Sequence, residues 1–183
     1  MLINKQKTKV ISFSKSRKFD FPPELEFNDG SILETMTETK LLGVIISQDL
    51  KWNKNTTYIC DKARQKLWFL RRLLKFNLTR SEMFDVYIKE IRSILEFAVP
   101  VWHLGLTRKQ SIAIERIQKL ALKIVLQEDY LNYKNACNVF SADTLEVRRK
   151  KLCLKFATKN LKSEIICFPI HKSDFHKEVK ETK

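Results

Sequence analysis

The spacing of apolar side chains predicts that the chain is mostly helical from Asn53 onward. In the segment that starts there, apolar residues recur every three or four positions and therefore share one helical face. That face consists of Ile59, Ala63, Leu67, Leu70 and Leu74. The same period returns after Thr79, after Thr107 and after Ser141 or Thr144. We therefore expect a bundle of about four helices that bury these faces against one another.

The second and third helices begin with a capping signal. Thr79 stands three residues before Glu82, and Thr107 stands three residues before Gln110. Each pair matches the capping box, in which two side chains bond the free amides of the first turn. Pro100 is expected to end the second helix, because proline disrupts a helix interior. The apolar faces of the last three helices are expected to comprise Met83, Tyr87, Ile91, Ile94 and Leu95; Ile114, Ile117, Ala121, Ile124 and Val125; and Leu145, Leu152, Phe156 and Ala157.

Short apolar or alternating stretches predict strands before the helices. Leu41–Ile46 is apolar apart from Gly43 and is predicted to be a buried strand, in which the glycine marks a bulge or the close approach of another backbone. Lys9–Ser14 is expected to form another strand, and residues 28–30 a turn between two more. The predicted fold class is α+β, mainly α: a small N-terminal antiparallel sheet followed by a bundle of about four helices.

The patterns divide the chain into three parts. Residues 1–52 are expected to form a small β-rich unit, residues 53–163 the helical bundle, and residues 164–183 a polar tail. The chain has only 3 glycines and 4 prolines, which argues against an all-β fold with many tight turns. Four dispersed cysteines, with no signal peptide and no long apolar run, favour a nuclear or cytoplasmic protein that is neither secreted nor bound to a membrane.

The chain is strongly basic, with 35 Lys and Arg against 21 Asp and Glu and a net charge of +14. Such an excess favours a polyanionic partner: RNA, DNA or an RNA–DNA hybrid first, and an anionic membrane second. Cations recur along the predicted helices at Lys62, Lys66, Arg71 and Arg72; at Arg116, Lys119 and Lys123; and at Arg148, Lys151, Lys155 and Lys159. Rows of this kind can follow a phosphate backbone without reading base sequence. The alternatives are an ordinary solvated helix face and a surface that serves solubility.

Aromatic residues lie among these cations at Trp52, Trp68, Phe69, Phe76 and Trp102. Aromatic rings beside cations can stack on unpaired bases. We nevertheless expect these rings in the core, because Trp68 and Phe69 belong to a helix that has to bury apolar surface.

No catalytic motif or cofactor site is predicted, and no small-molecule substrate is expected. Glycine-rich phosphate loops are absent from the sequence. The possible zinc ligands are Cys153, Cys167, His171 and His176. They include no closely spaced cysteine pair, so no metal site is expected. His103 is expected to be a structural histidine with its hydrogen bonds satisfied.

The run Thr39–Asn55 resembles the segment that follows the polymerase palm in reverse transcriptases of non-LTR (LINE-type) retrotransposons. The resemblance assigns Leu42 and Gly43 to the primer-grip motif, with Trp52 just beyond it. The helical stretches Trp68–Arg72, Tyr87–Arg92, Leu95–Trp102 and Ile114–Lys119 are further points of similarity. The resemblance implies that the basic helices correspond to the thumb, which in this family grips the template–primer duplex.

Residues 2–8 resemble the fourth palm motif of the same family, L-x-N-x-x-K-T, through Asn4, Lys7 and Thr8. Nucleotidyl transfer needs paired carboxylates to hold two metal ions, and this family carries them in a Tyr-x-Asp-Asp hairpin. No Asp-Asp dipeptide occurs in the sequence. We therefore expect a truncated fragment without polymerase activity of its own, whose catalytic part would precede Met1.

A second resemblance covers Lys40–Leu70, which is similar to a domain named after the amino-terminal part of the AlkB-type alkylation-repair dioxygenase. Oxygenases of this type hold iron with two histidines and a carboxylate, usually beginning as His-x-Asp. None of His103, His171 and His176 has an aspartate two positions later, so oxygenase chemistry is not expected. An inert remnant and a protein-interaction scaffold remain as alternatives.

Overall fold

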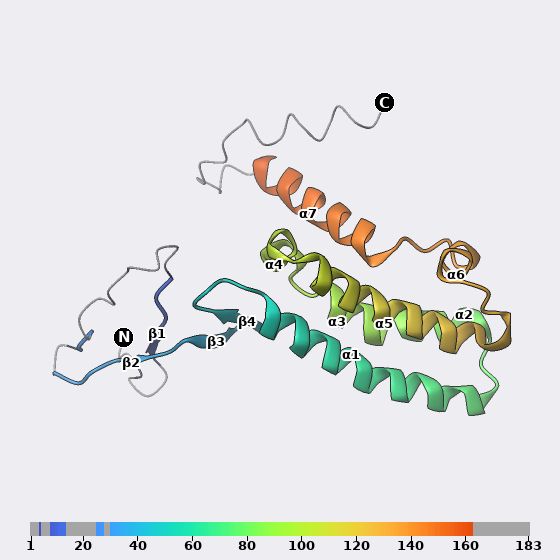
Figure 1. The fold of residues 1–183 in the computed structure, drawn as a ribbon, viewed down its shortest axis with the longest axis horizontal. Helices are drawn as coiled ribbons and strands as arrows, with labels where there is room; N and C mark the ends of the chain where they lie inside the picture. The colour runs from blue at the N-terminus through green and yellow to red at the C-terminus, as the bar shows by residue number, and fades with distance from the viewer. Residues whose placement is uncertain (1–3, 5–7, 14–24, 28–29, 163–183) are drawn as a thin grey trace.

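The computed structural model describes residues 4, 8–13, 25–27 and 30–162. Figure 1 shows short strands at one end of an elongated helical body. The strands are β1 (Lys9–Val10), β2 (Glu34–Thr35), β3 (Glu38–Leu41) and β4 (Val44–Ser47). The helices are α1 (Asn53–Leu73), α2 (Arg80–Val86), α3 (Ser93–Glu96), α4 (Val99–Trp102), α5 (Arg108–Leu126), α6 (Tyr133–Val139) and α7 (Leu145–Lys162). Tighter or wider helical turns are η2 (Leu74–Phe76), η3 (Tyr87–Arg92), η4 (His103–Gly105) and η5 (Gln127–Asp129). The predicted mainly α, α+β fold class is confirmed.

Helix α1 is the central element, because β4, η3, α3 and α5 all pack against it. Its predicted apolar face is buried at Ile59, Ala63, Leu67 and Leu70. Two asparagines anchor its first turn. The Gln110 side chain of α5 donates to Asn53 Oδ1 at 2.7 Å, and the Ile45 amide of β4 donates to Asn55 Oδ1 at 3.1 Å. The start of α1 is thereby held to both α5 and the strand before it.

The stretch predicted as one buried strand, Leu41–Ile46, is instead a hairpin. Leu41 ends β3 and pairs with Val44, the first residue of β4. Leu42 and Gly43 form the turn, with φ values of +46° and +90°; a left-handed φ is normal for glycine in a hairpin turn. The predicted close approach at Gly43 is present but involves a side chain, since an added Cβ would lie 3.0 Å from the ring of Phe97.

The other strands form a separate pair. β1 and β2 run parallel with Lys9 opposite Glu34, whereas β3 and β4 are antiparallel. The strand expected from Lys9 is therefore only two residues long within the described region. The predicted turn near Gly30 is flanked by an antiparallel bridge between Glu26 and Ile32, while residues 28 and 29 lie outside the described residues. The three-part division of the chain stays a prediction, and its tail also lies outside them.

The second predicted helix ends four residues before Pro100. Its capping box is formed by Thr79 and Glu82, as expected. The helix continues from α2 through the π-turn η3 and ends with α3 at Glu96, and Ala98 then adopts a left-handed conformation with φ +51°. Pro100 lies in the first turn of α4, where the missing amide breaks no helical hydrogen bond. The prediction that Pro100 ends a helix was wrong, because proline is equally compatible with the start of one.

Between α5 and α7 the structure contains a helix, α6, that the sequence pattern missed. α6 is seven residues long and is capped by Asn132, whose side chain accepts from the Asn135 amide. The predicted third helix is α5, with the expected capping box of Thr107 and Gln110. The predicted fourth helix is α7, which packs against α4 and α5. Leu145 is buried as expected, but Phe156 is 52% exposed and does not belong to the core.

One glutamine connects the helices around α5. The Tyr87 hydroxyl of η3 donates to Gln118 Oε1 at 2.5 Å. Gln118 Nε2 donates to the Tyr133 hydroxyl of α6 at 2.9 Å and to the Asp143 carbonyl oxygen, just before α7, at 3.0 Å. Gln118 is only 1% exposed. Its amide therefore satisfies buried polar groups on three other parts of the fold.

We predict that Gln118→Leu lowers the free energy of unfolding by about 2–4 kcal/mol. Leucine has a similar size but leaves the Tyr87 hydroxyl and the Asp143 carbonyl without these partners, and each unsatisfied buried group costs roughly 1–3 kcal/mol. Urea unfolding followed by circular dichroism measures the change. Gln65→Leu, on the exposed side of α1, is the matched control and should change stability by less than about 0.5 kcal/mol. Equal effects of the two substitutions would contradict the assigned role.

Candidate nucleic-acid interface

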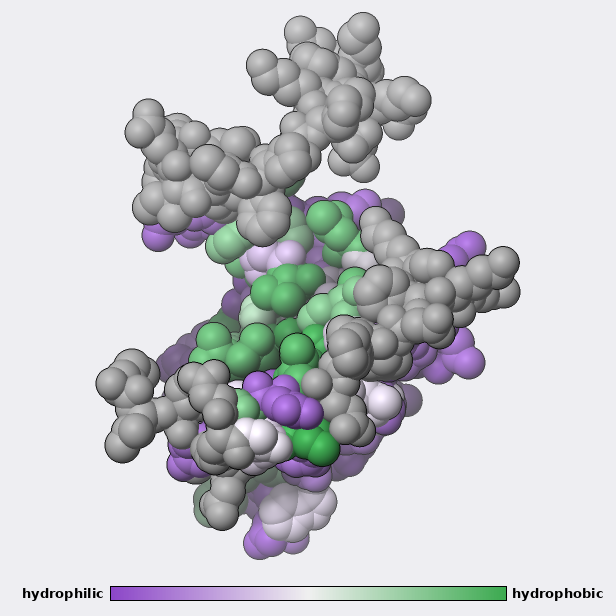
Figure 2. All heavy atoms as spheres, turned by 90° about the vertical axis from the view of Figure 1, so that its left-hand side faces the viewer, coloured by the Kyte–Doolittle hydropathy of each residue, from purple (hydrophilic) through white to green (hydrophobic). Residues whose placement is uncertain are grey.

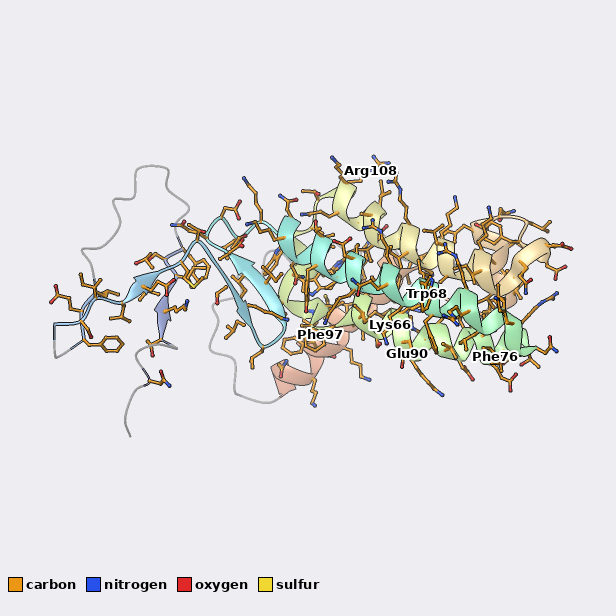
Figure 3. All side chains as sticks on the ribbon, turned by 90° about the horizontal axis from the view of Figure 1, so that it is seen from below. Lys66, Trp68, Phe76, Glu90, Phe97 and Arg108 are labelled. Carbon is orange, nitrogen blue, oxygen red and sulfur yellow. The ribbon has the colours of Figure 1, made fainter. Side chains whose placement is uncertain are left out.

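Helices α1 and α5 pack against each other, and each leaves one side exposed (Figure 3). On α5 the exposed side carries Arg116, Lys119 and Lys123, which are three and four residues apart and therefore neighbours on the helix surface. Within the described part of the chain, none of these three cations has a carboxylate within ion-pair distance, and the same holds for Arg71 on α1. Their charges are therefore available to a ligand.

Two of the four cations predicted on α7, Arg148 and Lys151, form ion pairs within the protein. Arg148 is half-buried and forms two hydrogen bonds with the Glu96 carboxylate, from Nε and, at 2.9 Å, from Nη2. The hydrogen bond with Glu96 raises the pKa of Arg148, so the guanidinium stays charged and links α3 to α7. Lys151 Nζ lies 2.7 Å from Asp143 Oδ2. Lys155 and Lys159 are exposed. Helix α7 thus has fewer cations available to a ligand than its sequence suggests.

Apart from Arg71, the predicted cations of α1 fall into two kinds. Lys66 forms an ion pair with Glu90 of η3 at 2.7 Å, and the two side chains lie next to each other in Figure 3. Lys62 and Arg72 instead lie over aromatic rings: Lys62 Nζ is 4.9 Å from the centroid of Tyr58, and the Arg72 guanidinium is 4.8 Å from that of Trp68. The ring attracts the cation but has no net charge, so the charge of the cation is not neutralised.

The expectation that the aromatic residues are core was wrong for Trp68, Phe69 and Phe76. Trp68 is 58% exposed and Phe76 is 69% exposed. The apolar face of α1 is narrow, and its smaller aliphatic residues fill the space against α5. Trp102 is buried as expected, and its indole nitrogen donates to the Phe97 carbonyl at 2.9 Å. Trp52 is half-buried over Gly105, where an added Cβ would clash with the indole.

A cleft of about 380 Å³ lies between the β3–β4 turn, α1 and α3. Its lining consists of Lys40, Gly43, Tyr58, Ile59, Lys62, Ser93, Ile94 and Phe97. Lys40 Nζ donates to the Tyr58 hydroxyl at 2.7 Å. Hydrogen bonds from Lys40 and then Lys62 lower the pKa of Tyr58, because both ammonium groups stabilise the phenolate. Figure 2 looks at the molecule from the strand end and shows apolar residues gathered in the middle of this face.

The residues assigned by the palm and primer-grip resemblance do not form one site. Gly43 lines the cleft, while Leu42 is exposed at the tip of the turn. Trp52 packs on Gly105 instead. Asn4 and Thr8 make a local turn in which the Thr8 hydroxyl donates to the Asn4 carbonyl at 2.9 Å. Lys7 lies outside the described residues.

Sequence reasoning missed a buried arginine. Arg149 is fully buried, its Nη2 donates to Ser111 Oγ at 2.6 Å, and its Nε and Nη1 have no partner. Burial lowers the pKa of Arg149, and burial together with Arg149 lowers the pKa of His103. The expectation that the hydrogen bonds of His103 are satisfied was wrong for Nδ1, which is buried without a partner among the described residues. Both residues belong to segments that pack together, η4 and α7. Arg149 lies four residues after Leu145 and three before Leu152, so the helical period places it on the buried face, whereas its charge favours the surface.

The described residues contain no group of three His, Cys, Asp or Glu side chains that could hold a metal ion. Of the candidate zinc ligands only Cys153 is among them, as a free thiol; Cys167, His171 and His176 lie outside. No described helix has the length and apolar character needed to cross a membrane.

Comparison with known proteins gives one match. Residues 52–81 match the family described as "Alkylated DNA repair protein alkB homolog 8, N-terminal". The matched segment comprises α1, η2 and the beginning of α2. No curated protein and no solved structure matches the chain. The similarity to the AlkB-type domain is thus supported over a short segment, while the comparisons give no support to the resemblance to reverse transcriptases.

We predict that Tyr58 is the first tyrosine to ionise as pH rises. Its pKa is lowered by Lys40 and Lys62, whereas burial raises the pKa of Tyr87, Tyr130 and Tyr133. Absorbance titration at 295 nm should therefore show one early phenolate step that is lost in Tyr58→Phe. Lys40→Met should move that step to higher pH. If Tyr58→Phe leaves the first step in place, the arrangement of the cleft is wrong.

Proposed function

We propose that the chain is a non-catalytic nucleic-acid-binding module that contacts phosphates through exposed cations of α1 and α5. The observation that carries the proposal is that four exposed cations of α1 and α5 have no carboxylate partner among the described residues: Arg71, Arg116, Lys119 and Lys123. A basic side chain that is not neutralised internally retains its full attraction for a polyanion. The net charge of +14 supports the same ligand class.

The spacing of these cations suits a phosphate backbone. Residues three or four apart on a helix stand about 5–6 Å from each other, so the three cations of α5 form a short row along its axis. The 19 residues of α5 extend over about 28 Å at 1.5 Å per residue. Contacts of this kind bind by releasing counterions and do not depend on base sequence. RNA, DNA and an RNA–DNA hybrid are all suitable ligands.

We further propose that the chain is a fragment of a retrotransposon reverse transcriptase, with the helical bundle as its thumb-like part. The resemblance of residues 39–55 to the non-LTR family supports this origin. So does the basic surface, because a thumb holds the template–primer duplex. The fragment lacks the paired aspartates of the polymerase centre and would bind nucleic acid without extending it.

The second candidate is a nucleic-acid-binding segment related to the amino-terminal part of an AlkB-type alkylation-repair protein. The observation that favours it is the family match over residues 52–81. The name of that family refers to DNA repair, so this candidate also proposes that α1 binds nucleic acid. It predicts no iron chemistry for the described residues, which hold no three-ligand cluster. Backbone binding by α1 is common to both origins.

The proposal predicts a strongly salt-dependent affinity for an RNA–DNA hybrid. In a plot of log K against log salt concentration, each phosphate contact contributes a slope of about −0.9. The triple substitution Arg116→Gln, Lys119→Gln and Lys123→Gln should therefore make the slope shallower by about 3 while the circular dichroism spectrum is unchanged. Fluorescence anisotropy with a labelled hybrid duplex at several salt concentrations measures both slopes.

A matched control separates the α5 row from net charge. Lys9→Gln, Lys54→Gln and Lys151→Gln together remove the same charge, but these lysines are ion-paired with Glu34, Glu38 and Asp143. This control variant should keep nearly the full slope. An equal loss in both triple variants would show that only overall charge matters, and a flat plot for the unmodified protein would exclude backbone binding altogether.

A further inference from the structure

The C-terminal half of α1 and the turn η2 carry large aromatic rings on the outside of the protein. Trp68 is 58% and Phe76 is 69% exposed, and Phe69 between them is also exposed. Trp68 and Phe76 lie along the same helix and its final turn (Figure 3). We call Trp68, Phe69, Arg72 and Phe76 the aromatic strip. Isolated exposed apolar residues are common, but three exposed aromatic rings within nine residues concentrate apolar surface in one segment of the chain.

All charged residues next to the aromatic strip in the sequence are basic. Residues 62–75 contain six basic and no acidic side chains. Arg72 stacks on the Trp68 ring at 4.8 Å, and Arg71 has no ion-pair partner among the described residues. Lys66 alone of these cations is paired across to another helix, with Glu90. A ligand that covers the rings must therefore be anionic as well as able to contact aromatic faces.

We propose that the aromatic strip binds the unpaired bases of a single-stranded nucleic acid by stacking. An unpaired nucleotide has both properties that the strip requires, because its base has a flat π-face and its phosphate is negatively charged. A duplex meets only the second requirement, since its bases are stacked on one another. This proposal adds a specific class of ligand, single-stranded nucleic acid, to the backbone contacts proposed above. It rests on the proposed function only in that the ligand is a nucleic acid.

The dimensions of the strip fit a few nucleotides. Trp68 and Phe76 are eight residues apart, which corresponds to about 12 Å along a helix axis. Stacked nucleotides rise about 3.4 Å each along one strand, so the strip can accommodate about three. Arg72 lies against one ring and within the row of cations, and is placed to contact a phosphate next to a stacked base.

The decisive comparison uses two probes with equal numbers of phosphates. One is a twelve-nucleotide oligothymidylate, and the other is an abasic strand of the same length. Stacking contributes to the first and not to the second, so the unmodified protein should bind oligothymidylate about tenfold more tightly. In the double variant Trp68→Ala and Phe76→Ala this preference should disappear, while the affinity for the abasic strand changes less than twofold.

Tryptophan fluorescence gives an independent readout. The protein has three tryptophans, of which Trp102 is buried and Trp52 half-buried. Oligothymidylate should quench the emission of the unmodified protein, and Trp68→Phe should abolish most of the quenching while keeping the affinity within about threefold. Leu104→Ala, which changes an 88% exposed apolar residue outside the strip, should alter neither affinity nor quenching.

Several results would overturn the proposal. Equal binding of the two probes by the unmodified protein would exclude stacking, and so would an unchanged preference in the double variant. Quenching by vesicles of anionic lipid without quenching by oligothymidylate would assign the strip to a membrane. These failures are distinct from failure of the proposed function, because backbone binding is tested by the salt dependence of the α5 variants and does not require Trp68 or Phe76.

Discussion

The burial of the single apolar stripe of α1 determines how the rest of the structure is arranged. Because β4, η3, α3 and α5 cover that stripe, the opposite side of α1 faces outward, and its exposed residues include many basic and aromatic side chains. Asn53 and Asn55 fix the beginning of the helix to α5 and to β4. A narrow aliphatic stripe therefore both holds the fold together and forces Trp68 and Phe76 into contact with solvent.

The helical parts of the fold were predictable because their signals are local. The three-to-four residue period and the two capping boxes each depend on residues within one or two turns, and these predictions were confirmed. Leu41–Ile46 was misassigned because β-branched residues favour a strand, whereas the positive φ values at Leu42 and Gly43 make a two-residue turn. α6 was missed because seven residues are too few to establish a helical period.

The sequence predicted which basic residues form the candidate interface, but not which of them are free to bind a ligand. The rows of cations follow from the sequence, yet which of them are neutralised depends on distant partners. Lys66 forms an ion pair with Glu90 of the next helix. Arg148 forms one with Glu96, which precedes it by more than fifty positions in the sequence. The exposure of Trp68 also depends on the tertiary structure. Leu67 and Leu70 occupy the buried face of the helix, and Trp68 therefore lies on its exposed side.

The π-turn η3 has a consequence for how the chain tolerates change in length. Met83, Tyr87, Ile91 and Leu95 are all buried and are each four residues apart. In a regular α-helix four residues overshoot a turn by about 40°, so Met83 and Leu95 would diverge by about 120°. The wider turn absorbs one residue and keeps all four on the core side. Loss of a single residue there would leave eleven residues from Met83 to Leu95, which is within about 20° of three full α-helical turns. Regular α-helical winding would then keep Met83 and Leu95 on the core side, so the middle of this helix is a place where a one-codon deletion can be absorbed.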